Sequence, residues 1–158
     1  MNELKYIFYF FVALFLGIQL FIPDKNIGEI NPKGSFENEI ETPADIKKML
    51  SNACYDCHSN NTKYPWYADV APMSWYVAGH VEDGKAKLNF STWSDYSQEE
   101  KQKKLDRNAD LVKRRWMPMH EYLGQHPEAL MTNEEVGRLS DWFSEIELGQ
   151  EIRQCIDQ

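Results

Sequence analysis

The sequence predicts an all-α domain preceded by a single N-terminal transmembrane helix. Apolar residues recur at helical spacing in four separate stretches after the N-terminal segment. No stretch shows the alternation of apolar and polar residues that is typical of a half-buried strand. Helix-capping residues and prolines stand where these stretches begin and end, which supports helices as their structure.

The segment from residue 6 to residue 22 is apolar apart from Gly17 and Gln19. A helix of this length reaches ~26 Å, close to the ~30 Å hydrocarbon core of a bilayer. A cleaved secretory signal is the alternative. However, the run is longer than a usual signal core, and no small-residue cleavage site precedes Pro23. We therefore expect residues 1–23 to be an uncleaved anchor in contact with membrane lipid.

Residues 24–41 are rich in Asn, Gly, Pro, Ser and acidic residues, which predicts a linker. Two interpretations stay open for this segment. It is a flexible tether that lets the following domain reach partners, or it is pinned against the domain through Ile27, Ile30 and Phe36.

The domain proper is predicted over residues 42–149. Thr42 as N-cap, with Pro43 at the first helical position, opens a helix that leads directly into Cys54. A second helix begins near Pro72. The apolar faces of these two helices are predicted to contain Ile46, Met49, Leu50 and Ala53, and Met73, Tyr76, Val77, His80, Val81 and Gly84.

The third and fourth helices each begin with a predicted capping box, in which a Ser or Thr lies three residues before a Glu. These pairs are Ser97 with Glu100 and Thr132 with Glu135. The third helix is expected to run to Trp116 and to stop before Pro118. The fourth carries its apolar face to Ile146 and is closed by Gly149.

A net charge of −8 and a pI of about 5.0 argue against a nucleic-acid partner, because nucleic-acid binding requires a basic face. The chain has three cysteines. Two belong to the motif below, and the third, Cys155, lies in a short C-terminal tail over residues 150–158 and is interpreted as a spare thiol.

Cys54, Cys57 and His58 form a Cys-x-x-Cys-His motif. This spacing is typical of covalent haem attachment: the two thiols bond to the porphyrin, and the histidine becomes the proximal iron ligand. Two alternatives exist, a zinc site and a redox disulfide. A zinc site requires a further Cys or His nearby, and the sequence has none close to the motif. A redox disulfide of the thioredoxin type requires parallel strands, which the sequence does not predict. We therefore expect one covalent haem c with its iron.

Iron held on both faces needs a second ligand opposite His58. Met117 is preferred, because Pro118 ends the helix and leaves the thioether on a rigid turn. Met119 and His80 are the alternatives, and His120 and His126 are weaker candidates.

Three residues before the preferred ligand are also expected to contact the haem. Trp116 is interpreted as a packing partner of the ring. Arg114 or Arg115 is a candidate to pair with a haem propionate, since a guanidinium binds a carboxylate through two hydrogen bonds.

The chain resembles the small bacterial haem-binding-domain proteins, which are membrane-anchored, cytochrome c-like chains common in Bacteroidetes. The resemblance runs through Ala53–Asn60, Tyr64–Tyr67, Ala71–Pro72 with Ser74–Trp75, Leu88–Ser91 with Trp93, Met117–Pro118, and Tyr122 with His126–Ala129. It implies haem c at Cys54, Cys57 and His58, with Met117 as the sixth ligand. The family commonly has a second Pro after Met-Pro where this chain has Met119, which leaves the choice between the two methionines open.

These observations lead to the hypothesis of a mono-haem c-type cytochrome that carries single electrons and has no substrate chemistry of its own. In bacteria haem c is attached outside the cytoplasmic membrane, so the resemblance implies an inner-membrane, single-pass protein with a periplasmic haem domain. Redox proteins or a respiratory complex are the expected partners. The alternatives are a haem sensor or small peroxidase with a labile distal site, and a structural haem subunit of a larger complex.

Overall fold

The computed structural model describes residues 2–28, 32–146 and 148. The longer helices are α1 (Asn2–Ile18), α3 (Ala44–Ala53), α5 (Met73–Lys87), α6 (Gln98–Lys113) and α8 (Asn133–Glu145). The short α-helices are α2 (Phe36–Glu39), α4 (Tyr55–His58) and α7 (His120–Leu123). The 3₁₀ helices are η1 (Gln19–Phe21), η2 (Pro32–Gly34), η3 (Trp66–Asp69), η4 (Phe90–Asp95) and η5 (Pro127–Ala129). The described residues form no strand, so the all-α prediction is confirmed.

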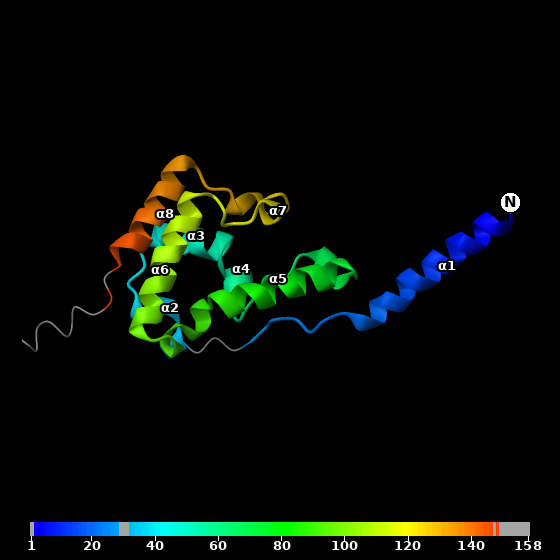
Figure 1. The fold of residues 1–158 in the computed structure, drawn as a ribbon, viewed down its shortest axis with the longest axis horizontal. Coiled ribbons are helices and arrows are strands. Elements are labelled where there is room, and N and C mark those ends of the chain that lie inside the picture. The colour runs from blue at the N-terminus through cyan, green and yellow to red at the C-terminus, as the bar shows by residue number, and fades with distance from the viewer. Residues whose placement is uncertain (1, 29–31, 147, 149–158) are drawn as a thin grey trace, which may run out of the picture.

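The hydrophobic core lies around α6 and α8, which pack side by side (Figure 1). Ser140 Oγ donates a hydrogen bond of 3.0 Å to Ala109 O and joins the two helices. Helix α3 contributes Ile46 and Leu50 to the same core. The fully buried large side chains are Trp93, Phe36, Phe143, Ile46, Leu50, Leu105 and Leu139. Because α3 is anchored in this core, the chain that follows it has a fixed starting point.

The predicted linker is packed against the domain. Phe36 is completely buried, and its ring makes edge contacts with Phe90, Trp93 and Trp142 at centroid distances of 5.0, 4.9 and 6.0 Å. Burial of a phenylalanine side chain stabilises a fold by about 1.5–3 kcal/mol. The structure therefore favours the pinned alternative over the tether for this part of residues 24–41.

The first part of the same segment is held by Asn26. Its side-chain amide donates to Ser59 O at 2.8 Å, and its Oδ1 accepts a hydrogen bond of 2.5 Å from Lys85 Nζ. Ile27 forms an isolated bridge with Asn61 but stays 68% exposed, so it does not pin the segment by burial as suggested. Ile30 lies outside the described residues.

Both predicted capping boxes are present, at Ser97 with Glu100 and at Thr132 with Glu135. The start of α3 differs from the prediction. Pro43 is the N-cap, the helix begins at Ala44, and Thr42 Oγ1 donates to Ile40 O instead of capping.

The end of α6 lies three residues before the predicted Trp116, because Arg115 adopts a left-handed backbone with φ 56°. Arg115 N–H donates to Val112 O and Trp116 N–H donates to Leu111 O, both at 2.9 Å. This is the Schellman arrangement, which usually has glycine at the left-handed position. The chain has arginine there, so its sequence does not signal the stop.

The end of α8 also differs from the prediction. The helix stops at Glu145, because Ile146 is extended with φ −68° and ψ 108°. Gly149, the predicted closing residue, and Cys155 lie outside the described residues.

Helix α1 projects away from the rest of the helical domain (Figure 1). With η1 it gives one candidate membrane span, Glu3–Phe21, of 19 residues, none of which is buried against the rest of the protein. Its length and composition suit a membrane span, although a signal sequence meets the same criteria.

Candidate functional site

The Cys-x-x-Cys-His motif consists of Cys54, which separates α3 from α4, and of α4 itself. Cys54 ends α3 and precedes α4, and its carbonyl accepts hydrogen bonds from the backbone of Cys57 at 3.3 Å and of His58 at 3.0 Å. The two thiols are free and partly buried. The helical turn therefore presents both thiols and the imidazole from one short segment.

The His58 ring is oriented by the backbone of α5. Its Nδ1 lies 3.0 Å from Gly84 O and 3.0 Å from Leu88 O. Since carbonyl oxygens only accept hydrogen bonds, Nδ1 carries the proton and Nε2 is the nitrogen left for a metal. Burial lowers the pKa of His58, which keeps the imidazole neutral, as iron ligation requires.

The absence of a side chain at Gly84 permits this contact. A Cβ at this position would lie 2.5 Å from Cys57 O and 3.1 Å from Cys57 Cβ. Only glycine therefore lets α5 approach α4 closely enough for its carbonyls to reach His58. Sequence reasoning placed Gly84 on the apolar face of α5 and missed this role, because a glycine within a helical pattern does not reveal what it touches.

Both thiols are uncharged at neutral pH. Burial raises the pKa of Cys54 to about 12, with Cys57 as a second cause, and burial together with Asp56 raises the pKa of Cys57 to about 11. A thiolate is the reactive form in disulfide exchange and in zinc binding. Among the described residues, no three His, Cys, Asp or Glu side chains converge to hold a metal ion. These observations argue against the zinc and redox-disulfide alternatives.

Two adjoining cavities lie beside the motif, with volumes of about 620 and 210 Å³. The larger is lined mainly by apolar and aromatic side chains of η3, α5 and α7. The smaller is lined by Cys54, His58 and Met117, among others. The two share Asp56, Cys57, His80, Met119 and Tyr122 in their walls. Together they form an apolar slot bordered by both thiols and the imidazole, which fits the chemistry of a haem.

The three leading candidates for the sixth ligand lie at this slot, and of the two weaker ones His126 lines the larger cavity whereas His120 lines neither. Met117 lines the smaller cavity together with His58, whereas Met119 and His80 line both cavities. The His80 ring makes an edge contact with Tyr76 at a centroid distance of 4.3 Å. The structure thus brings all three candidates together with the motif, and the choice of Met117 stays a prediction.

The predicted haem contacts of Trp116, Arg114 and Arg115 are not brought to the slot. Trp116 is 62% exposed and lies beside the Arg114 guanidinium, which pairs with Asp110 Oδ1 at 2.7 Å. Arg115 Nη2 donates to Asn133 Oδ1 at 2.6 Å. Among the described residues, none of these three lines either of the two cavities that form the slot. The physical reason is the early end of α6, which turns these side chains toward solvent and α8.

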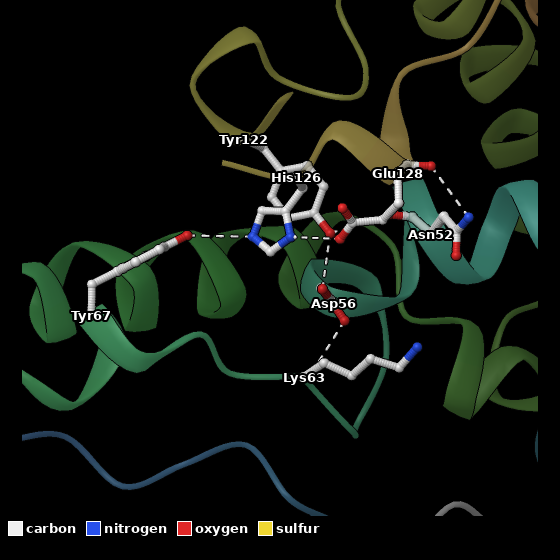
Figure 2. A network of polar contacts seen from close by, with 7 residues as sticks. All are labelled: Asn52, Asp56, Lys63, Tyr67, Tyr122, His126 and Glu128. Carbon is white, nitrogen blue, oxygen red and sulfur yellow. Dashed lines mark hydrogen bonds and ion pairs between the residues drawn. The ribbon is translucent and has the colours of Figure 1, made fainter. Parts of the chain in front are cut away.

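Asp56, between the two cysteines, is a buried carboxylate (Figure 2). Its Oδ2 accepts a hydrogen bond of 2.8 Å from Tyr122 Oη, and its Oδ1 accepts one of 3.2 Å from Lys63 N–H. Burial and the adjacent Asp56 raise the pKa of Tyr122 well above its usual range, so the phenol stays protonated and donates. The first bond joins α4 to α7, and the second holds α4 to the loop that follows it.

A second chain of polar contacts flanks Tyr122 (Figure 2). The His126 ring stacks on Tyr122 at a centroid distance of 4.1 Å. His126 Nδ1 lies 3.1 Å from Glu128 Oε1, and its Nε2 lies 3.3 Å from Tyr67 Oη. Hydrogen bonds from its own backbone N–H and from His126 lower the pKa of Glu128. Because the ionised carboxylate accepts, Nδ1 donates to it and Nε2 accepts from Tyr67.

Comparison with known proteins adds one finding. Residues 13–145 match the family described as Haem-binding domain. No match was found among curated proteins or among solved structures.

Proposed function

The chain belongs to the haem-binding-domain family, and from this premise we propose that it is a mono-haem c-type cytochrome that carries single electrons. One observation carries the proposal: the His58 Nδ1 proton is held by the backbone carbonyls of Gly84 in α5 and of Leu88, its C-cap, which leaves Nε2 for iron beside two free thiols. A backbone acceptor on the second ring nitrogen is the arrangement typical of metal-ligating histidines.

Each residue of the motif has its own task in this proposal. Cys54 and Cys57 form the covalent links to the porphyrin, and His58 is the proximal ligand. Met117 is the distal ligand, with Met119 and His80 as alternatives. The haem supplies a one-electron couple between ferrous and ferric iron. The protein orients His58, excludes water from the apolar slot and performs no substrate chemistry.

The location of the protein is part of the same proposal. Segment Glu3–Phe21 anchors the chain in the inner membrane of a bacterium, and the haem domain lies in the periplasm. The partners are then redox proteins or a respiratory complex that meet the domain at the membrane.

Optical spectra of the purified full chain test this proposal. We expect the spectrum of six-coordinate, low-spin haem c in both redox states, unchanged when carbon monoxide is added to the ferrous protein. Rapid formation of a carbon monoxide adduct would favour the sensor or peroxidase hypothesis, because those activities need an open or labile distal site. Absence of a haem c spectrum would contradict the proposal.

A further inference from the structure

An exposed aromatic surface lies where the apolar helix meets the haem domain. We name it the aromatic tip, and it consists of Trp66, Met73, Trp75 and Tyr76, which are 80, 43, 40 and 49% exposed. These residues come from η3 and the first turn of α5, two elements that pack against each other. Exposed apolar groups gathered on one surface mark an interaction site more often than single exposed residues do.

The tip is joined directly to the end of the candidate membrane span. The Gln19 side-chain amide donates to Ala71 O at 3.1 Å and accepts from Ala71 N–H at 2.9 Å. Trp75 Nε1 donates to Phe21 O at 2.6 Å. Leu20 and Phe21, at the end of the span, are 83 and 72% exposed. The tip therefore lies next to the level at which α1 and η1 leave the bilayer, and it is continuous with the apolar surface of the span.

The charge around the tip also suits a lipid surface. In a chain of net charge −8, the stretch from Tyr64 to Val81 contains a single carboxylate, Asp69. That carboxylate forms an ion pair of 2.6 Å with Lys25. Within this stretch the one carboxylate is already paired, so moving the stretch toward lipid takes no unpaired acidic side chain out of water.

We propose that the aromatic tip docks into the headgroup region of the bilayer from which α1 emerges. This inference rests on the proposed membrane anchor. Tryptophan and tyrosine prefer this region because one part of the ring system is apolar and the other forms hydrogen bonds. Trp66, Met73 and Tyr76 also line the larger cavity, so docking places that side of the haem slot against the membrane. The haem domain then lies on the bilayer instead of extending away from it.

The experiment uses the full haem-loaded chain, labelled with 5-fluorotryptophan and reconstituted in lipid nanodiscs at one chain per disc. Single Trp→Phe variants assign the five fluorine resonances. Two properties are measured for each: the shift between H₂O and D₂O, which reports solvent exposure, and the broadening by gadolinium-chelating lipid relative to its lutetium form. Trp116 is the matched control, because it is 62% exposed but lies beyond the end of α6.

We expect Trp66 to lose at least half of the solvent shift that Trp116 keeps, and to broaden at least twofold more than Trp116 with gadolinium lipid. Retention of the chain in the bilayer after alkaline extraction is measured on the same sample. If the chain stays in the bilayer while Trp66 is fully solvated, the docking is overturned and the anchor is left intact. A covered Trp66 without lipid broadening assigns the cover to the haem, whose slot Trp66 lines, or to protein, and also overturns the docking. Loss of the chain from the bilayer overturns the anchor and the docking together.

Discussion

Replacement of Gly84 by alanine tests how the fold orients His58. The added Cβ would lie 2.5 Å from Cys57 O, closer than the 3.0 Å below which real Cβ contacts essentially never occur. Helix α5 must therefore retreat from α4 by about 0.5 Å or more. A displacement of that size takes the two 3.0 Å bonds from His58 Nδ1 to the limit of hydrogen-bond geometry.

Two results are expected from Gly84→Ala. Overpacking lowers the free energy of unfolding by about 1–3 kcal/mol, which corresponds to a melting temperature roughly 4–15 °C lower. Weaker hydrogen bonds to Nδ1 make the imidazole a poorer electron donor, so the reduction potential rises. Calorimetry and a spectroelectrochemical titration of the haem-loaded protein measure the two effects.

Gly79→Ala in the same helix is the matched control, because a Cβ at Gly79 meets nothing within 4 Å apart from the adjacent backbone of α5 itself. Alanine is favoured over glycine inside a helix by about 1 kcal/mol, so this variant should be slightly more stable with an unchanged potential. The reasoning is refuted when Gly84→Ala matches Gly79→Ala in stability and keeps the wild-type potential.

Four further predictions follow from the site and the helix ends. Tyr122→Phe removes a donor to buried Asp56 and should cost about 1–3 kcal/mol of unfolding free energy in denaturant titrations; an unchanged value would contradict this role. Because the pKa of Tyr122 is raised above 10.0, the folded protein keeps a proton that the unfolded chain releases, so stability should fall above about pH 10, and less steeply in this variant. Arg115→Gly should be about 1 kcal/mol more stable than Arg115→Ala, since both lose the same side chain and only alanine is strained at φ 56°; equal stabilities would contradict the strain. Met117→Ala should let the ferrous protein bind carbon monoxide rapidly, whereas Met119→Ala should not, and the reverse result would assign the ligand to Met119.

The long helices of the haem domain were predictable because their signals are local. The Ser97 and Thr132 capping boxes each need only four residues of sequence, and both form. The end of α6 was not predictable, since Arg115 occupies a backbone conformation for which glycine is the usual signal. The burial of Phe36 was one of two open interpretations, because one aromatic residue in a polar segment gives no periodicity that would decide between them.

The site was predictable where side chains define it. Cys54, Cys57 and His58 were predicted as haem-binding residues from their spacing alone, and this assignment stays a prediction, whereas the membership in the haem-binding-domain family is confirmed. What orients His58 was missed, because its acceptors are the backbone carbonyls of Gly84 and Leu88, and a carbonyl has no sequence signature. Gly84 and Leu88 also lie 26 and 30 positions after His58 in the chain, so only the folded protein shows that they are in contact.

The central claim is that one haem is bonded covalently to Cys54 and Cys57. The mass of the denatured full chain, purified from membranes and freed of non-covalent ligands by acidified organic solvent, tests it most directly. The account predicts the mass of the polypeptide plus one haem, and retention of at most one thioether in Cys54→Ala and in Cys57→Ala. The mass of the polypeptide alone, with the colour removed into the solvent, would contradict it.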